Sequence, residues 1–297
     1  MTGDEILVVG QSGQLARALV RLGAIAGRQI ICTGRPDLDL AQPDTVQEVI
    51  ERIAPVMVIN AAAYTAVDQA ESEPETAFAI NADGVSVLGR QCARRQIPMI
   101  HVSTDYVFDG SATQPYAPDD PVAPQGAYGQ SKAAGEAILR EVLERHIILR
   151  TAWVFSGGGK NFLTTMIGAG AGRSELRVVD DQHGSPTYAA DLAQGIAEIA
   201  TRILREPQNS YWGTYHLTNS GATTWCGFAR EIFACQARTG VAIPEVVAIT
   251  TADYPTPARR PKWSVLDCAP TERIFGVCLP DWKDATARCI AQLSDLE

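Results

Sequence analysis

Tyr128 and Lys132 are the residues of this sequence whose types and spacing point most clearly to chemistry. On a helix, positions i and i+4 lie on one face about one turn apart. We expect the ammonium of Lys132 to stabilise the phenolate of Tyr128 and to lower its pKa from about 10 toward neutral pH. Such a tyrosine exchanges a proton with an oxygen of a bound substrate. Because this spacing is also common on ordinary helix surfaces, other residues must support the interpretation.

A predicted buried strand, 97–102, leads to a third candidate residue, Thr104. In open α/β sheets, ligands bind outside the carboxyl ends of strands, where a hydroxyl group can bond a substrate oxygen. Thr104, Tyr128 and Lys132 together resemble the Ser/Thr-Tyr-Lys triad of the short-chain dehydrogenase/reductase superfamily. The resemblance implies that these three residues are catalytic.

The start of the chain contains a dinucleotide-binding pattern. An apolar strand, 5–10, turns through Gly10 and Gly13 into a helix that begins near Gln14 and Leu15. The first glycine permits a tight turn, and the second lets the backbone approach a pyrophosphate at the helix N-terminus. A plain tight turn is the alternative, but the position after the first strand favours a cofactor site.

The second predicted strand, 29–33, ends next to Arg35 rather than next to a carboxylate. NAD-binding proteins usually place an acid here to hold the ribose 2′-hydroxyl, whereas arginine accommodates a 2′-phosphate. We therefore predict NADPH as the cofactor, with NADH still usable because exposure at the sheet edge should weaken the contact; Asp37, two residues on, argues against a strong preference. The alternative is that Arg35 is a solvated loop residue.

Two further segments are expected to contact the cofactor. Asp39 and Leu40 resemble an Asp-Leu/Val pair of the superfamily, in which the aspartate approaches the adenine. After the strand 56–60, small residues let ribose and phosphate lie against the backbone, and the predicted contacts there are Ala61, Ala63, Tyr64 and Thr65. Asn81 either supports the active-site strand or is a polar surface residue on a long predicted helix, 75–95.

The alternation of strands and helices predicts an α/β fold: a Rossmann-type doubly wound parallel sheet with a smaller C-terminal substrate-binding region. The NAD(P)-binding domain is predicted to comprise 1–155 and about 187–218, which returns to the sheet. The substrate-binding region is predicted to comprise 156–186 and 219–297. In that region the loop 254–263 is basic, and Arg259 and Arg260 either bind phosphates of the substrate or form a solvated turn.

Composition narrows the function classes. The 297 residues carry a formal net charge of -9, which argues against nucleic acid as a partner. The longest apolar runs are shorter than the ~20 residues that span a bilayer, and residues 1–5 lack the basic segment of a secretory signal. Seven cysteines without a C-x-x-C motif fit reduced thiols. We predict a cytoplasmic protein that has no membrane partner and no metal site.

Longer stretches resemble the dTDP-4-dehydrorhamnose reductase family, namely 60–68, 71–75, 101–108, 128–132, 181–187 and 254–261. The resemblance covers nearly the whole chain and implies reduction of the C4 keto group of dTDP-4-dehydro-L-rhamnose. It implies that Tyr128 is the proton donor to the C4 oxygen, that Thr104 bonds this oxygen, and that Lys132 holds the nicotinamide ribose. It also implies that Thr104, Asp105 and Trp153 contact the sugar nucleotide, although packing is the alternative for the tryptophan.

Other functions stay open at this point. The family has relatives that keep the fold and act as non-catalytic regulatory subunits, and it has sister reductases or epimerases of other nucleotide sugars. The intact triad favours an enzyme. Some members form dimers that bind magnesium through carboxylates; a homodimer is therefore possible here, but no such carboxylate cluster is recognisable in the sequence.

Overall fold

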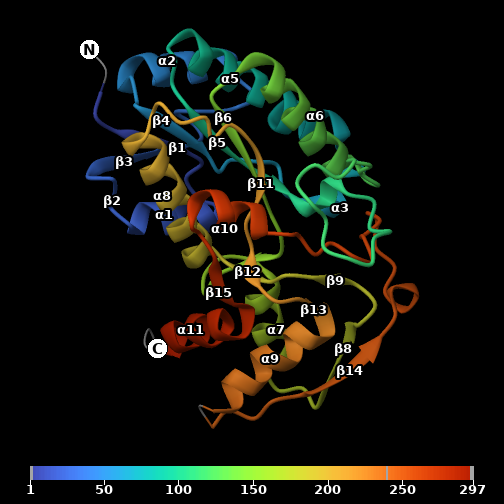
Figure 1. Cartoon of the computed structure of the whole chain (residues 1–297). Helices are drawn as coiled ribbons and strands as arrows, with labels where there is room; N and C mark the ends of the chain where they lie inside the picture. Colours follow the sequence, from blue (N-terminus) through green and yellow to red (C-terminus); the bar gives the residue numbers. More distant parts are fainter. Residues whose placement is uncertain (1–2, 239, 295–297) are drawn as a thin grey trace.

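A seven-stranded sheet in the order β11-β6-β5-β4-β1-β3-β2 forms the centre of the computed structural model, which describes residues 3–238 and 240–294 (Figure 1). Residues 1–2, 239 and 295–297, which belong to the two predicted domains, lie outside this description. The strands, in sheet order, are β11 (Gly213–His216), β6 (His146–Thr151), β5 (Met99–Thr104), β4 (Met57–Asn60), β1 (Ile6–Val9), β3 (Arg28–Thr33) and β2 (Ala24–Ile25). All neighbours pair in parallel except β2, which forms an unpredicted antiparallel edge on β3.

Strand β1 shows why the sheet is covered on both faces. Its four residues are fully buried, and successive side chains of a strand point to opposite faces. Ile6 and Val8 join one apolar core, and Leu7 and Val9 join another. The first core contains α1 (Gln14–Arg21) and α8 (Ala189–Arg205), and the second contains α2 (Pro43–Ile53), α5 (Gly84–Arg94) and α6 (Ala127–Val142). The predicted α/β class and doubly wound sheet are confirmed.

The strand order reverses at β1, because β3 lies on one side of it and β4 on the other. The connections that leave β1 and β4 therefore diverge at the carboxyl ends of these strands. In doubly wound sheets this divergence opens the crevice that binds the ligand.

The predicted helix 75–95 is interrupted. It consists of α4 (Pro74–Phe78), a π-helical segment (Ala79–Asp83) and α5. Such π-helical turns are rare and are frequent at functional sites. This one contains Asn81, so the interruption falls on a residue that the sequence had already singled out.

A smaller region packs beyond the carboxyl ends of the central strands, in the lower part of Figure 1. Its helices are α7 (Phe162–Gly170), α9 (Trp225–Ala237) and α11 (Trp282–Ser294). Its short strands form the pairs β7 (Val154–Phe155) with β10 (Thr187–Tyr188), β8 (Glu175–Val179) with β14 (Glu245–Ile249), β9 (His183–Gly184) with β13 (Thr223–Thr224), and β12 (Asn219–Ser220) with β15 (Leu279–Asp281). Aromatic side chains fill its core, where Phe228 packs against Phe155 and edge-on against Trp282.

Two further short α-helices of the chain are α3 (Val67–Ala70) and α10 (Ala269–Phe275).

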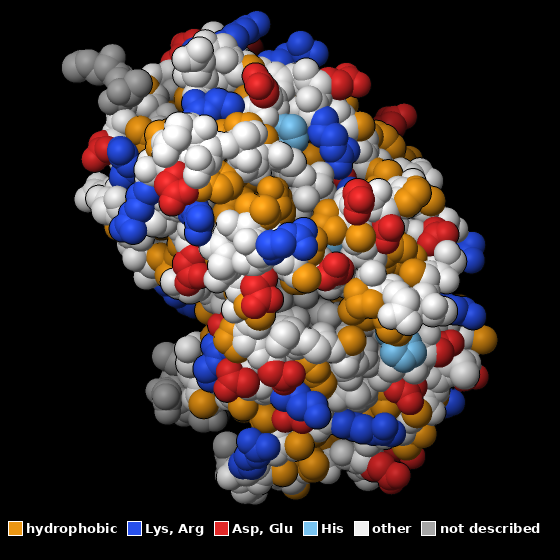
Figure 2. Space-filling model, in the orientation of Figure 1, with side chains coloured by type: hydrophobic (Ala, Val, Ile, Leu, Met, Phe, Trp, Pro, Cys, Tyr) orange, Lys and Arg blue, Asp and Glu red, His pale blue; other side chains and the backbone are white. Residues whose placement is uncertain are grey.

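The face of the molecule shown in Figure 2 carries both kinds of charge. On the face shown in Figure 2, basic and acidic side chains are interspersed. Within the described ranges, no helix is both long enough and apolar enough to cross a membrane.

Candidate active site

The loops that follow five neighbouring strands carry most of the predicted site residues. Because β3, β1, β4, β5 and β6 are parallel, these loops leave the sheet at the same edge. Arg35 follows β3, residues 10–14 follow β1, and residues 61–65 follow β4. Residues 104–105 lie at the end of β5, and Trp153 follows β6. The structure thus brings together at one edge residues that are far apart in the sequence.

Helix α6 contributes Tyr128 and Lys132, and both are buried. Tyr128 is 9% exposed and Lys132 is 2% exposed. The Lys132 Nζ donates to the Val102 carbonyl oxygen at 2.8 Å and lies 3.2 Å from His101 Nε2, so the amino group is anchored to β5. The Tyr106 ring packs edge-on against Tyr128 with 5.6 Å between ring centroids.

The expectation of a lowered phenol pKa is wrong for this structure. Burial raises the pKa of Tyr128 to about 12, although a hydrogen bond with Thr104 lowers it. Burial also lowers the pKa of Lys132 to about 8. The sequence argument neglected burial, which disfavours both charged forms. Tyr128 is therefore protonated at neutral pH, which is the form that a proton donor needs.

Thr104 and Asp105 lie at the end of β5. The Thr104 Oγ1 donates to Asp105 Oδ1 at 3.0 Å and accepts from the Tyr106 N–H at 3.2 Å. Burial raises the pKa of Asp105 to about 6. The neighbouring Ser264 and Thr104 hydroxyls lower this pKa, yet the buried Oδ2 has no partner at full hydrogen-bond geometry within the described part of the chain. An acceptor left in this state is costly, so a donor on a bound ligand would be stabilised there.

The N-terminus of α1 has room for a ligand. Gly10 has a φ of +115°, and a Cβ on it would lie 3.1 Å from the Ala62 nitrogen. A Cβ on Gly13 would meet no heavy atom within 4 Å, and no side chain caps the helix there. Open space in front of uncapped N–H groups suits the pyrophosphate of a dinucleotide. The next residues have structural roles: the Gln14 Nε2 donates to the Val154 carbonyl at 3.1 Å, and Leu15 is buried in the core.

Asn81 joins the loop after β4 to helix α6. Its Oδ1 accepts from the Tyr64 N–H at 2.8 Å, and its Nδ2 donates to the Tyr64 carbonyl and to Ser131 Oγ, each at 3.0 Å. Ser131 Oγ in turn donates to the Tyr128 carbonyl at 2.8 Å. Asn81 is buried, so it is not a surface residue, and its side chain bonds these two elements rather than the active-site strand.

Comparison with known proteins now identifies the family. A family model described as the RmlD substrate binding domain matches residues 4–295. The dTDP-4-dehydrorhamnose reductase of Sinorhizobium fredii is 43% identical over 286 residues, 96% of each chain. Solved structures of dTDP-4-dehydrorhamnose reductases are similar over 98% of this chain and 99% of theirs: one from Clostridium acetobutylicum (TM-score 0.89, 37% identity) and one from Bacillus anthracis in complex with NADP (0.88, 34%). The chain belongs to the dTDP-4-dehydrorhamnose reductase family.

Membership of this family was predicted from the sequence and is confirmed.

The basic loop 254–263 differs from the expectation in one respect. Arg260 forms a bidentate ion pair with Asp68 of α3, with Nη1–Oδ1 and Nη2–Oδ2 distances of 3.0 and 2.9 Å. Its charge is therefore balanced by the protein. Arg259 is exposed and donates to Gln125 Oε1 at 3.1 Å.

The other predicted cofactor residues lie around the same edge. Arg35 is exposed, whereas Leu40 is buried in the core. The Asp39 Oδ1 accepts from the Ala41 N–H at 3.0 Å, and the aspartate is half-buried. In the loop after β4, Ala61, Ala63 and Tyr64 are half-buried and Thr65 is exposed.

Trp153 has one face covered by protein. Its indole stacks on Trp225 at a centroid distance of 3.5 Å and an interplanar angle of 5°, and the indole packs so close to Gly184 that no Cβ would fit there. It is half-buried and has a φ of +47°. The stacking shows a packing role, and the predicted sugar contact stays a prediction.

Two contacts of helix α6 were missed by sequence reasoning. Glu71 Oε1 accepts from the Ala127 N–H at 2.9 Å and so binds the first turn of α6. The stretch 71–75 had been noticed only as a family resemblance. The contact between His101 and Lys132 was also missed, because nothing in an apolar strand indicates which way one histidine points.

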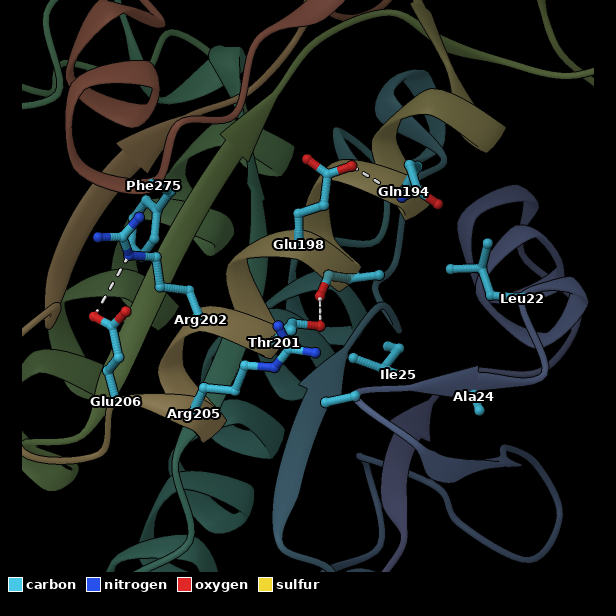
Figure 3. Close-up of a pocket in the computed structure, with 12 residues that line it drawn as sticks. Leu22, Ala24, Ile25, Gln194, Glu198, Thr201, Arg202, Arg205, Glu206 and Phe275 are labelled. Carbon is cyan, nitrogen blue, oxygen red and sulfur yellow. Dashed lines mark hydrogen bonds and ion pairs between the residues drawn. The ribbon is translucent and has the colours of Figure 1, made fainter.

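A cavity of about 540 Å³ lies away from this site (Figure 3). It is lined by the end of α1, by β2, by the C-terminal half of α8 and by the end of α10. None of the predicted site residues lines it; its lining includes Leu22, Ile25, Glu198, Thr201, Arg202 and Phe275. Among the described residues, no group of three or more His, Cys, Asp or Glu side chains is arranged to hold a metal ion.

Proposed function

We propose that this chain reduces the C4 keto group of dTDP-4-dehydro-L-rhamnose to give dTDP-L-rhamnose, with NADPH as the source of the hydride. The observation that best supports this is the position of Thr104 and Tyr128 at the sheet edge where the loops after β1 and β4 diverge. A relative of 43% identity carries the name of this enzyme, and a similar solved structure contains NADP.

In the proposed reaction the chain supplies the proton and the positioning groups. Tyr128 gives its phenolic proton to the C4 oxygen, and Thr104 hydrogen-bonds the same oxygen while charge develops on it. The ammonium of Lys132 stabilises the phenolate that remains and holds the nicotinamide ribose. Asp105 and Trp153 bind the sugar nucleotide, and Arg259 and Arg260 bind its phosphates.

The cofactor is proposed to lie along the loops after β1, β3 and β4. The uncapped N-terminus of α1 at Gly13 would hold the pyrophosphate. Arg35 would pair with the 2′-phosphate, which gives a modest preference for NADPH with NADH still usable. The remaining proposed contacts are Gly10, Gln14, Leu15, Asp39, Leu40, Ala61, Ala63, Tyr64 and Thr65.

We also propose that the chain divides its work between two regions. Residues 1–155 with about 187–218 would bind NADPH, and 156–186 with 219–297 would bind the sugar nucleotide. Pairing of β11 with β6 supports the inclusion of the later segment in the first region. All seven cysteines are free, which supports a cytoplasmic location, and a homodimer is compatible with the family.

Turnover of a small substrate panel tests the proposal. The purified protein is mixed with NADPH and dTDP-4-dehydro-L-rhamnose, and in parallel with other 4-keto nucleotide sugars, while NADPH absorbance is followed. We expect oxidation of one NADPH per sugar, fastest with the rhamnose precursor. An epimerase would convert sugars without net NADPH oxidation, and a regulatory subunit would bind NADPH without turnover. Either result would overturn the proposal.

A further inference from the structure

A chain of polar groups runs from the loop after β4 to Lys132. The Ala62 N–H donates to Asn60 Oδ1 at 3.1 Å, and Asn60 Nδ2 lies 3.0 Å from His101 Nδ1. On the other side of the ring, His101 Nε2 lies 3.2 Å from Lys132 Nζ. Asn60, His101 and Lys132 are all buried, so each depends on neighbouring protein groups for its hydrogen bonds.

The first member fixes the direction of the chain. A backbone N–H can only donate, so the Asn60 atom that faces Ala62 is the carbonyl oxygen, and the amide nitrogen faces His101. Because an amide nitrogen also only donates, Nδ1 of the ring accepts. A neutral imidazole that accepts at Nδ1 carries its proton on Nε2, and this N–H points at Lys132.

His101 is held in its neutral form. Burial lowers its pKa well below the usual value, and the charges of Lys132 and His146 lower it further. The groups that face Lys132 are His101 and the Val102 carbonyl on β5, and Tyr128 and Glu136 on its own helix. Of these, the Glu136 carboxylate favours the ammonium, whereas an N–H that points at Nζ favours the amine.

We propose that His101 is a positioning residue whose Nε2–H donates to Lys132 Nζ and thereby stabilises the uncharged amine of this lysine. An ammonium would place N–H donors of the two groups against each other. The amine accepts from the ring and still donates to the Val102 carbonyl at 2.8 Å. The ring therefore acts in the same direction as burial, which lowers the pKa of Lys132 to about 8.

The expected effect on activity rests on the proposed function, in which the ammonium is the active form of Lys132. The kcat/KM for NADPH, which reports the ligand-free enzyme, should fall as the pH rises through about 8. Any change that turns the ring or removes its N–H should keep Lys132 charged to higher pH.

Two variants reverse the contact in different ways. In Asn60→Asp the carboxylate still accepts from Ala62 and now also accepts from Nδ1–H, so Nε2 becomes an acceptor for the ammonium. In His101→Gln the amide oxygen can accept from both Asn60 and Lys132. We expect both variants to move the alkaline limb of kcat/KM up by about one pH unit. The matched control is His146→Gln, a buried histidine on β6 that contacts the Leu143 carbonyl rather than Lys132. Burial lowers the pKa of His146, so its ring is uncharged near pH 8 and its replacement should leave the limb in place.

Nuclear magnetic resonance gives a readout that does not depend on activity. In the ligand-free protein with ¹⁵N-labelled histidine, assigned through His101→Gln, we expect the Nε2–H tautomer for His101 in the wild type and the Nδ1–H tautomer in Asn60→Asp. The ¹³Cε resonance of Lys132 should titrate at higher pH in both variants than in the wild type. An Nδ1–H tautomer in the wild type, or an unmoved or lowered Lys132 titration in both variants, overturns the proposal even if the enzyme is inactive on every sugar tested.

Discussion

Helix α6 and the loop 254–263 were both selected from the sequence by their charged or titratable side chains, yet the structure treats them differently. On α6, Tyr128 and Lys132 are buried, and burial moves both pKa values. In the loop, Arg259 is exposed, and Arg260 has its charge balanced by Asp68. Burial makes the first pair chemically unusual, whereas the arginines keep ordinary cationic chemistry. The difference in burial supports the proposal that α6 carries the reaction, while the loop keeps its proposed role in binding.

The largest expected effect removes the proton donor. Tyr128→Phe keeps the ring and its contact with Tyr106 but deletes the phenolic proton, so kcat should fall by roughly 10²–10⁴-fold. NADPH binding, measured by fluorescence titration, should change little. Turnover near the wild-type rate would show that Tyr128 is not the acid. It would also contradict the proposal that α6, rather than the loop 254–263, carries the reaction.

A second change tests how much the buried ion pair of α6 contributes to the free energy of unfolding. Glu136 lies one turn after Lys132, and its carboxylate binds Arg150 at 2.9 Å (Nε) and 2.7 Å (Nη2), with both side chains buried. Glu136→Leu leaves a buried guanidinium without its partner and should lower the free energy of unfolding by about 3–5 kcal/mol. The control is Arg140→Ala, which removes a half-exposed partner of the same carboxylate and should cost about 0–1 kcal/mol. Urea denaturation measures both, and equal losses would contradict this account.

Variants of Arg260 and Asp68 distinguish two roles of the loop, phosphate binding and anchoring to α3. If its guanidinium binds substrate phosphates, Arg260→Ala should raise KM for the sugar nucleotide about tenfold, and less so at high salt. Asp68→Asn tests the alternative, because it breaks the ion pair but keeps the cation. A KM that rises in Arg260→Ala and stays level or falls in Asp68→Asn supports phosphate binding. Equal increases in both variants would mean that Arg260 only anchors the loop to α3.

The smallest effect concerns the cofactor. Arg35 is exposed, so its pairing with a 2′-phosphate should be partly screened by solvent. Arg35→Ala should reduce the ratio of kcat/KM for NADPH to that for NADH by at most about tenfold. Arg28→Ala, at the other end of β3, removes a cation paired with Asp4 and should not alter the ratio. Preference for NADH in the wild type would exclude Arg35 from this role.

The parts that sequence could predict are those that depend on local periodicity. The one-turn spacing places Tyr128 and Lys132 on one helix face, and the position of Thr104 at a strand end follows from the apolar run before it. Chain order also predicted the parallel sheet. These features need no knowledge of which distant side chains meet.

The parts that could not be predicted are contacts between distant segments. Arg260 and Asp68 are 192 residues apart, and Glu71 meets the start of α6 across 56 residues. Neither partner can be recognised until the loops are placed. The wrong pKa expectation for Tyr128 has the same origin, because a sequence shows the neighbouring cation but not the loss of solvent around both groups.

The most direct test of the central claim follows the hydride itself. NADPH carrying deuterium at the transferable C4 position is incubated with dTDP-4-dehydro-L-rhamnose and the enzyme, and the product is examined by proton and deuterium magnetic resonance. We predict dTDP-L-rhamnose with one deuterium at C4 of the sugar, and almost none from Tyr128→Phe in the same time. Deuterium that stays in the cofactor, or a product with the other configuration at C4, would contradict the proposed reaction.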